Sequence, residues 1–287
     1  MIRVLEAGPL TTVQDRGRHG LAHLGVPRGG ALDAPAAALA NRLLGNEKDA
    51  AVLEVLLGPF AARFGTGAWV CVTGAPCPVL VAGRPVAHGQ PVWVPAGAEL
   101  RTGVPREGVR AYLAVAGGIA VEPVLGSRST DTLAWVGPPP VAVGDELPVA
   151  PTRGRPQPHD TPRPPVRGPL RITPGPRTDW FADDAVAALC GSAYVAQADS
   201  NRVGLRLRGA PLGRERPEEL PSEGMVLGSV QVPPDGQPVV LLADHPTTGG
   251  YPVLGVVREE DLWQCAQLRP GERVSFALDR PPAGATR

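Results

Sequence analysis

Short apolar runs, each followed by turn residues, recur along the chain and constrain its fold more than any other feature. The chain of 287 residues contains 36 glycines and 35 prolines, and 43% of its residues are hydrophobic. So many turn residues would suggest disorder, but this hydrophobic fraction argues against it. We therefore expect a mainly β protein of many short strands, an antiparallel barrel or sandwich. The strand-sized runs of the first half are Ala51–Leu57, Ala68–Thr73, Val79–Ala82, Pro91–Val94 and Tyr112–Ala116.

A proline-rich stretch divides the sequence into two halves. Residues 151–168, PTRGRPQPHDTPRPPVRG, are nearly free of aliphatic side chains, which is typical of a linker or an exposed loop. Both halves begin with a strand, a loop and a short helix, which is consistent with a duplicated unit. We predict an N-terminal β-barrel domain over 1–150, a linker at 151–168, a C-terminal β-barrel domain over 169–280 and a tail at 281–287.

Local signals predict the remaining elements. Ala34–Leu44 is expected to be a helix, with Asp33 as its N-cap and Gly45 as its stop. Residues 8–33 are rich in glycine and too polar for a core element, so we expect a long connection there. A second helix is expected over Asp179–Gly191. Strands of the second half are expected at residues 171–173, Ala193–Gln197, Val203–Leu207, Val239–Ala243 and Arg273–Leu278.

Composition excludes several classes of function. The formal net charge is zero, so we expect no binding to nucleic acid or to a membrane surface. The only lysine, Lys48, lies in GNEKDA, which excludes a Walker A loop and the acceptor lysine of a biotin carrier. No His and Cys residues have metal-ligand spacing, so we expect no metal, and the four cysteines are predicted to be buried free thiols. The N-terminus lacks a signal-peptide pattern, so a reduced, cytoplasmic protein is expected.

The densest polar segment is DHPTTGGYP, directly after the apolar run Val239–Ala243. Asp244 beside His245 could form a carboxylate–imidazole pair for proton transfer, although a lone histidine is more often structural. Upstream, Glu223 and Gln231 could point into the mouth of a barrel. A strand buried on both faces would deliver this segment's polar side chains to its C-terminal end: Asp244, His245, Thr247, Thr248 and Tyr251.

Arginines near glycines form a second group of candidates. In TTVQDRGRHG and GVPRGGALD, the guanidinium groups of Arg16, Arg18 and Arg28 could bind a carboxylate or a phosphate. Alternatively, Asp15 and these arginines could pair with each other in a plain surface loop. In GSRSTDT, Ser127 and Arg128 could cradle an anion, but a helix cap is favoured from the residues alone. Asn201 and Arg202 precede a predicted strand, where asparagine often serves turn geometry.

These motifs, in their order, resemble the C-subunit family of prokaryotic 5-oxoprolinase. That family is also described as biotin-dependent carboxyltransferase-like, as allophanate hydrolase subunit 2 and as the antagonist of a kinase inhibitor, and it is similar to part of urea amidolyase. The resemblance spans about residues 2–280 and implies two cyclophilin-like β-barrel domains, with a few short helices and a cleft between the domains. It is carried by TTVQDRGRHG, GVPRGGALD, SRSTDT, SNRVGLRL and LPSEGMVLGSVQVPPDGQPVVLLADHPTTGGYPVLG.

The resemblance also implies an activity within a complex. The B-type and C-type subunits activate 5-oxo-L-proline with ATP, and the A-type subunit completes ring opening to L-glutamate. We therefore expect ATP, a B-type partner similar to kinase inhibitors, an A-type partner and no activity of this chain alone. Asp15, Asp244 and His245 are the expected catalytic residues. The expected binding residues are Arg16, Arg18, Arg28, Ser127, Arg128, Asn201, Arg202, Glu223, Gln231, Thr247, Thr248 and Tyr251.

Two other functions stay open. One is the carboxyltransferase component of a biotin-dependent system similar to urea carboxylase, which would need a biotin carrier on another chain. The other is a non-enzymatic antagonist that binds a kinase inhibitor. An apolar surface for another protein of the complex would suit all three readings.

Overall fold

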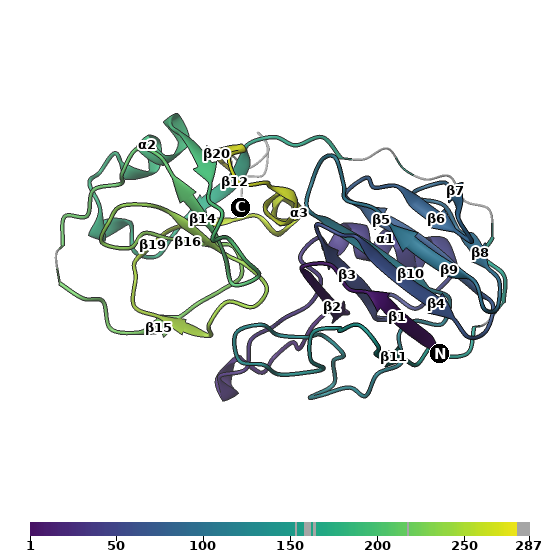
Figure 1. The fold of residues 1–287 in the computed structure, drawn as a ribbon. Coiled ribbons are helices and arrows are strands. Elements are labelled where there is room, and N and C mark those ends of the chain that lie inside the picture. The colour runs from purple at the N-terminus through teal and green to yellow at the C-terminus, as the bar shows by residue number, and fades with distance from the viewer. Residues whose placement is uncertain (153, 158–161, 163–164, 217, 280–287) are drawn as a thin grey trace. The chain divides into compact units, whose positions relative to one another are not determined.

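The protein consists of two compact units, Met1–Pro165 and Val166–Arg287 (Figure 1). The computed structural model describes residues 1–152, 154–157, 162, 165–216 and 218–279. The predicted tail at 281–287 and parts of the predicted linker lie outside the described residues. The expectation of a mainly β chain with a few short helices is confirmed.

The strands of the first unit form two antiparallel sheets. One sheet has the order β11–β1–β4–β9–β6–β7, with β1 (Ile2–Glu6), β4 (Phe60–Phe64), β6 (Val79–Val81), β7 (Arg84–Val86), β9 (Glu99–Thr102) and β11 (Glu146–Leu147). The other has the order β2–β3–β10–β5–β8, with β2 (Leu10–Gln14), β3 (Val52–Leu56), β5 (Ala68–Gly74), β8 (Val92–Val94) and β10 (Arg110–Val115). The five strands predicted for this half are confirmed, with ends that differ by a few residues.

The core of the first unit lies between its two sheets. Ile2 and Phe60 of the first sheet and Leu53 and Leu113 of the second belong to one buried cluster. The helix α1 (Ala34–Leu44) packs against β5 and β10 from the other side. Both faces of β10 are therefore covered, which explains why all six of its residues are buried.

The local signals that predict α1 are all present in its structure. The Asp33 side chain accepts a hydrogen bond from the amide of Ala36 at 3.0 Å, as an N-cap does. Gly45 ends the helix with a φ of 71°, a left-handed conformation that glycine adopts at little cost. The predicted bounds of this helix are confirmed.

The strand β2 is a correction to the sequence analysis, which expected a connection over residues 8–33. Its threonines and glutamine are buried, and most of their donors find acceptors inside the protein. The Thr11 hydroxyl donates to the carbonyl of Ala7 at 2.6 Å, and Gln14 Nε2 donates to the carbonyl of Thr130 at 2.9 Å. The prediction was wrong because the sequence does not display these partners.

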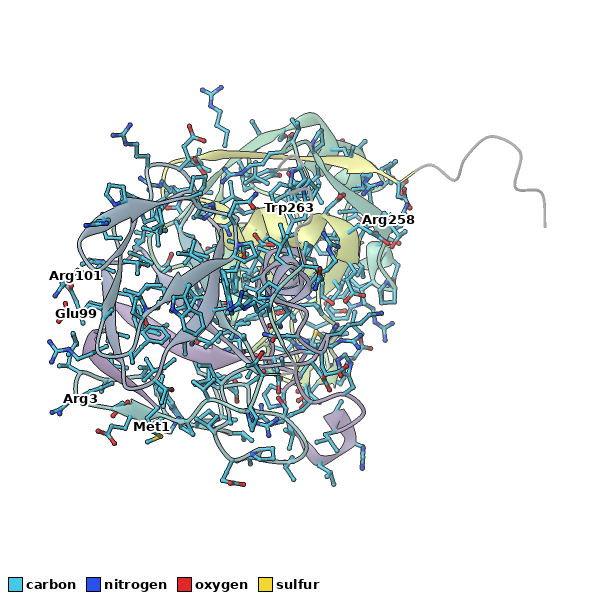
Figure 2. The ribbon with its side chains drawn as sticks, turned by 90° about the vertical axis from the view of Figure 1, so that its right-hand side faces the viewer. Met1, Arg3, Glu99, Arg101, Arg258 and Trp263 are labelled. Atoms are coloured by element: carbon cyan, nitrogen blue, oxygen red, sulfur yellow. The ribbon has the colours of Figure 1, made fainter. Side chains whose placement is uncertain are left out.

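The outer face of the first sheet is charged. Glu99 lies between two arginines, at 2.6 Å from Arg63 Nη2 and 3.2 Å from Arg101 Nη2. Figure 2 shows Glu99 and Arg101 side by side at the surface. Such exposed pairs contribute little to stability, so the buried cluster between the sheets holds the unit together.

The second unit contains a closed barrel with the order β12–β19–β16–β17–β14–β13–β20. The strands β12 and β20 are parallel and close the ring, while the other neighbours are antiparallel. The Tyr194 ring meets Phe276 edge-on, with centroids 6.0 Å apart, and both rings are buried. The strands are β12 (Leu170–Pro174), β13 (Ala193–Ala196), β14 (Gly204–Arg208), β16 (Ser229–Gln231), β17 (Val239–Leu241), β19 (Val253–Val257) and β20 (Arg273–Leu278).

Short elements complete the second unit. The strands β15 (Glu223–Gly224) and β18 (Thr248–Gly249) form a two-stranded sheet. The predicted helix over Asp179–Gly191 is shorter in the structure, where α2 covers Ala185–Gly191. The remaining helical segments are η1 (Ala22–Leu24), η2 (Thr178–Trp180), η3 (Glu259–Asp261) and α3 (Leu262–Gln267). Over the described residues, no helix combines the length and the hydropathy that a membrane crossing requires.

Candidate functional site

Asp15 follows β2 directly and is surrounded by donors. Its carboxylate accepts hydrogen bonds from the hydroxyls of Ser127 and Ser129 at 2.6 Å each. The amides of Arg128 and Gly17 donate to the same carboxylate at 2.6 and 2.8 Å. Burial disfavours the charged form, but the hydrogen bonds from the two serines and the two amides outweigh it and hold the pKa of Asp15 below its ordinary value. This carboxylate is thus anchored in its ionised form.

In GSRSTDT, the Ser127 hydroxyl and the Arg128 amide thus bind the Asp15 carboxylate. This is an internal contact between loops, and the binding of an external anion by Ser127 and Arg128 stays a prediction. Ser129, which the sequence analysis did not select, contributes as much as Ser127. A catalytic role of Asp15 stays a prediction.

Arg18 ties several loops of the first unit together. Its guanidinium is buried and donates to the carbonyls of Val124 at 3.0 Å and Ser129 at 2.6 Å. Its backbone amide donates to the carbonyl of Arg28 at 2.6 Å. The side chain of Arg16 is exposed, and those of Arg28 and Arg128 are half-buried. Of the predicted guanidinium groups in this unit, Arg16 is thus the most accessible to an external anion.

A buried polar network beside these loops was missed by the sequence analysis. Glu54 accepts hydrogen bonds from the Tyr112 hydroxyl at 2.8 Å and from the amide of Leu32 at 2.9 Å. Arg110 Nε lies 3.3 Å from the other carboxylate oxygen, and Tyr112 accepts from the amide of Asp33 at 2.8 Å. Burial, followed by the negative charge of Glu54, raises the pKa of Tyr112 well above its ordinary value. The network fixes the residues that lead into α1, and the signal for it was a glutamate inside the apolar run Ala51–Leu57.

In the second unit, Arg202 and Asp244 form a buried ion pair. Arg202 Nε and Nη2 donate to the two carboxylate oxygens of Asp244, at 2.9 Å each. The side chains are 1% and 0% exposed. The pair joins the residues just before β14 to those just after β17, and the amide of Asp244 also donates to the carbonyl of Arg202 at 3.1 Å. Two predicted site residues thus meet, and their bidentate contact neutralises both charges.

His245, which follows Asp244 in the sequence, is also buried. Its Nδ1 lies 2.7 Å from the carbonyl oxygen of Pro246, and because a carbonyl only accepts, Nδ1 donates. In the neutral ring the basic lone pair is then on Nε2. The predicted proton-transfer pair of Asp244 and His245 stays a prediction.

The sheet of β15 and β18 brings a second set of predicted residues together. Glu223 pairs with Gly249 in this sheet, and the amide of Met225 donates to the carbonyl of Thr247 at 2.9 Å. Arg177, which the sequence analysis missed, binds Glu223 with both Nε and Nη2. The hydrogen bond from Arg177 lowers the pKa of Glu223. Arg177 lies 46 positions from its partner, so no local pattern could have indicated the contact.

Gln231, at the end of β16, supports the same segment. Its Nε2 donates to the carbonyl of Tyr251 at 3.2 Å and to the sulfur of Met225 at 3.1 Å. A Cβ on Gly249 would lie only 2.8 Å from this nitrogen, so a larger residue there would displace the Gln231 side chain. The Tyr251 ring is 47% exposed, and Thr248 is exposed as well. The exposed groups are therefore held in place by a buried amide.

Asn201 has a different environment. Its side-chain oxygen accepts from the amides of Val203 at 2.8 Å and Gly204 at 3.2 Å, and the residue is exposed. This contact shapes the turn before β14, which is the structural reading considered in the sequence analysis.

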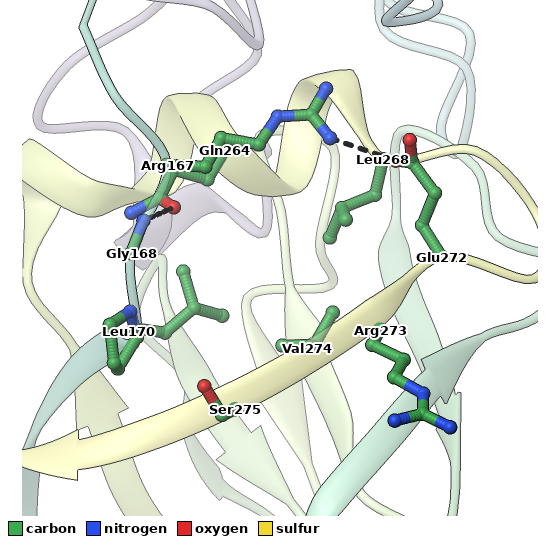
Figure 3. Close-up of a pocket in the computed structure, with 10 residues that line it drawn as sticks. Arg167, Gly168, Leu170, Gln264, Leu268, Glu272, Arg273, Val274 and Ser275 are labelled. Carbon is green, nitrogen blue, oxygen red and sulfur yellow. Dashed lines mark hydrogen bonds and ion pairs between the residues drawn. The ribbon is translucent and has the colours of Figure 1, made fainter.

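A cavity of about 410 Å³ lies beside α3 and β20 in the second unit (Figure 3). Arg167 donates to Glu272 at 2.8 Å, and the amide of Gly168 donates to Gln264 at 2.9 Å at its border. None of the predicted site residues lines it. Among the described residues, no group of three or more His, Cys, Asp or Glu side chains is placed to hold a metal ion.

Comparison with known proteins gives a consistent result. The family model of the carboxyltransferase domain, subdomain A and B, matches residues 24–278. A protein of Escherichia coli (strain K12), named as the C subunit of 5-oxoprolinase, is 39% identical over 280 residues, which cover 96% of this chain and 90% of that protein.

Two solved structures share the fold over 96% of this chain. The crystal structure of TTHA0988 has a TM-score of 0.86 at 40% identity, and the K. lactis urea amidolyase has a TM-score of 0.88 at 29% identity. The chain spans only 55% of the former and 18% of the latter. Both relatives thus contain further polypeptide beside the part that this chain matches.

Proposed function

Because the chain belongs to the carboxyltransferase domain family, subdomains A and B, we propose that it is the C-type subunit of an ATP-dependent 5-oxoprolinase complex. The complex would hydrolyse 5-oxo-L-proline to L-glutamate together with a B-type and an A-type protein. One observation carries this proposal: the match to the E. coli protein extends over 90% of that protein's length. The matches to urea amidolyase cover only a small part of that enzyme.

The chemistry of the substrate explains why ATP would be consumed. A lactam is a planar, resonance-stabilised amide and a poor electrophile, and phosphorylation of its oxygen would supply a good leaving group. Two amides of the glycine-rich loops are already engaged inside this chain. The amides of Gly17 and Arg128 are bound to Asp15, and Lys48 is exposed after α1. We therefore assign most nucleotide contacts to the B-type partner.

The second unit would contribute the groups that orient the lactam. Thr248 and Tyr251 are exposed on a segment that Gln231 and the β15–β18 sheet hold in place. His245 would move a proton through Nε2, since Nδ1 is engaged with Pro246. In the first unit, the exposed guanidinium of Arg16 would bind an anion such as a phosphate.

A reconstitution experiment tests the proposal. The purified chain is assayed alone, with the B-type protein, and with the A- and B-type proteins for ATP hydrolysis that depends on 5-oxo-L-proline. We expect activity only with all three proteins. His245→Gln should lower turnover roughly 10²–10⁴-fold while leaving complex formation unchanged. His88→Gln, at a half-buried histidine of the first unit, serves as the control.

The result also separates the alternatives. No 5-oxoproline-dependent hydrolysis by the three proteins together would refute the proposal. The structural match to urea amidolyase favours carboxyl transfer as the second candidate, which stimulation by carboxybiotin or urea would support. Stable pairing without turnover of any small amide would instead support a binding protein that antagonises a kinase inhibitor.

A further inference from the structure

The two short strands β15 and β18 form a sheet of their own, outside the seven strands of the barrel. Their register places Glu223 opposite Gly249. Two strands of this length are only marginally stable on their own. Gly249 and Gly250 also give the chain before Tyr251 more conformational freedom than other residues would. Contacts with the rest of the unit must therefore fix the segment that carries the exposed side chains of Thr248 and Tyr251.

One group of contacts joins this sheet to the barrel through buried side chains. Met225, directly after β15, packs with Leu241 and Val253 of the barrel strands β17 and β19. Gln231 of β16 donates to the Met225 sulfur at 3.1 Å and to the carbonyl of Tyr251 at 3.2 Å. These contacts hold the end of β15 and the backbone that follows β18.

The start of β15 is held by an ion pair. Arg177 Nε donates to the Glu223 carboxylate at 3.0 Å, and Nη2 binds the other carboxylate oxygen. Such a bidentate contact fixes the orientation of both groups. Arg177 follows β12 on a backbone that lies against the barrel, since the amide of Gly175 donates to the carbonyl of Leu254 at 2.9 Å and Trp180 is buried. The pair therefore ties the start of β15 to the barrel.

The exposure of this pair indicates that its role is local. The side chains of Arg177 and Glu223 are 37% and 28% exposed, and ion pairs with such access to water contribute little to overall stability. Glu223 lies opposite Gly249, two positions before Tyr251. A shift at Glu223 would thus move the chain that presents Thr248 and Tyr251. Misplacement of a binding group by about 1 Å can lower a rate roughly 10²-fold.

We propose that Arg177 and Glu223 form a clamp that positions Thr248 and Tyr251 for binding of the lactam. Both are positioning residues, because their charged groups bind each other and act on the substrate through the β15–β18 sheet. The sequence analysis expected Glu223 to bind the substrate directly, so the clamp assigns it a different role. This inference rests on the proposed function, in which the second unit orients the lactam.

Steady-state kinetics of the reconstituted three-protein complex tests the clamp. Arg177→Met should lower kcat/KM for 5-oxo-L-proline roughly 10²-fold. The KM for ATP should stay unchanged, because most nucleotide contacts are assigned to the B-type partner. Arg177→Lys keeps the positive charge and should recover part of the loss. Arg171→Met is the matched control and should keep the parent kinetics, because Arg171 also binds a carboxylate, that of Asp261, through Nε and Nη2.

A double variant shows whether the two residues of the clamp act as one unit. The loss in Arg177→Met/Glu223→Gln should be no larger than the loss in Arg177→Met alone, since both substitutions break the same contact.

Hydrogen exchange of the chain alone, read by NMR, tests the clamp without turnover. The amide of Met225 donates to the carbonyl of Thr247 at 2.9 Å and is released when the β15–β18 sheet opens. This amide should exchange faster in Arg177→Met than in the parent chain, and at the parent rate in Arg171→Met.

The outcomes separate the clamp from the proposed function. If the parent complex turns over 5-oxo-L-proline and Arg177→Met has the same kinetics, the clamp is refuted and the proposed function stands. A far larger loss in Glu223→Gln than in Arg177→Met also refutes the clamp, because Glu223 would then contact the substrate itself. If the parent complex has no activity, the proposed function and the positioning of the lactam are refuted together. An unchanged exchange rate of the Met225 amide refutes the clamp alone.

Discussion

Breaking the buried pair of Arg202 and Asp244 should destabilise the barrel unit strongly. The two side chains are 1% and 0% exposed and share two hydrogen bonds of 2.9 Å. Asp244→Asn removes the negative charge that pairs with the buried guanidinium of Arg202. Removing one partner of such a buried pair lowers the free energy of unfolding by about 3–5 kcal/mol. For a unit of this size, that loss corresponds to a fall in Tm of roughly 10–20 °C.

The double variant Arg202→Met/Asp244→Leu removes both charges. It therefore separates the cost of burying one unpaired charge from the contribution of the ion pair to the free energy of unfolding. Replacing both partners with apolar side chains of similar volume is often nearly neutral. We therefore expect the double variant to be more stable than either single variant, and the coupling free energy to be large.

Unfolding in urea and, separately, scanning calorimetry measure these differences in the free energy of unfolding. The exposed pair of Arg206 and Asp199 in the same unit is the control, with side chains that are 54% and 69% exposed. Asp199→Asn should cost less than about 1 kcal/mol. If Asp244→Asn costs no more than this control, the Asp244 carboxylate does not stabilise a buried guanidinium, and the argument is refuted.

Three further predictions concern the rest of the chain. The pKa of Asp15 is held below its ordinary 3.8, so its ionised form stabilises the fold above that pH, and the effect is lost as the pH falls through the lower folded value. The difference in unfolding free energy between the parent chain and Asp15→Asn should therefore shrink in acid, and a constant difference would contradict this. Gly137→Ala should cost at least roughly 1–2 kcal/mol, because φ is 101° and a Cβ would overlap the carbonyl of Ser129, which urea unfolding would reveal. Alkylation with iodoacetamide, read by mass spectrometry, should modify the half-buried Cys190 first, and early reaction elsewhere would disprove the order. Burial raises the pKa of all four thiols, to about 12 for Cys71, about 11 for Cys77 and about 12 for Cys265, while the accessibility of Cys190 sets the order of reaction.

Much of the fold could be predicted because its signals are local. Strand-sized apolar runs, an N-cap aspartate and a C-terminal glycine indicate β3, β5 and α1 without knowledge of any distant residue. The strand β2 escaped prediction for the opposite reason. Its Thr11, Thr12 and Gln14 look solvated in the sequence, and their burial depends on acceptors that the fold supplies.

The candidate site was predicted as a set of residue types but not as a set of contacts. Asp244 and Arg202 were both selected, yet the sequence paired Asp244 with its neighbour His245. The structure pairs it bidentately with an arginine 42 positions away. Arg177 was not selected at all, because its partner Glu223 lies 46 positions away along the chain.

The sequence by itself determined that the chain is mainly β, where many of its strands lie and which segments are rich in functional side chains, because turn chemistry and hydrophobic periodicity act over a few residues. Only the tertiary structure decided how the polar groups are used. Asp15 meets Ser127 across 112 positions because the fold brings that loop against the end of β2. A buried charge is hydrogen-bonded by the donors that the folded chain places around it. Which donors these are depends on the pairing of strands that are distant in sequence.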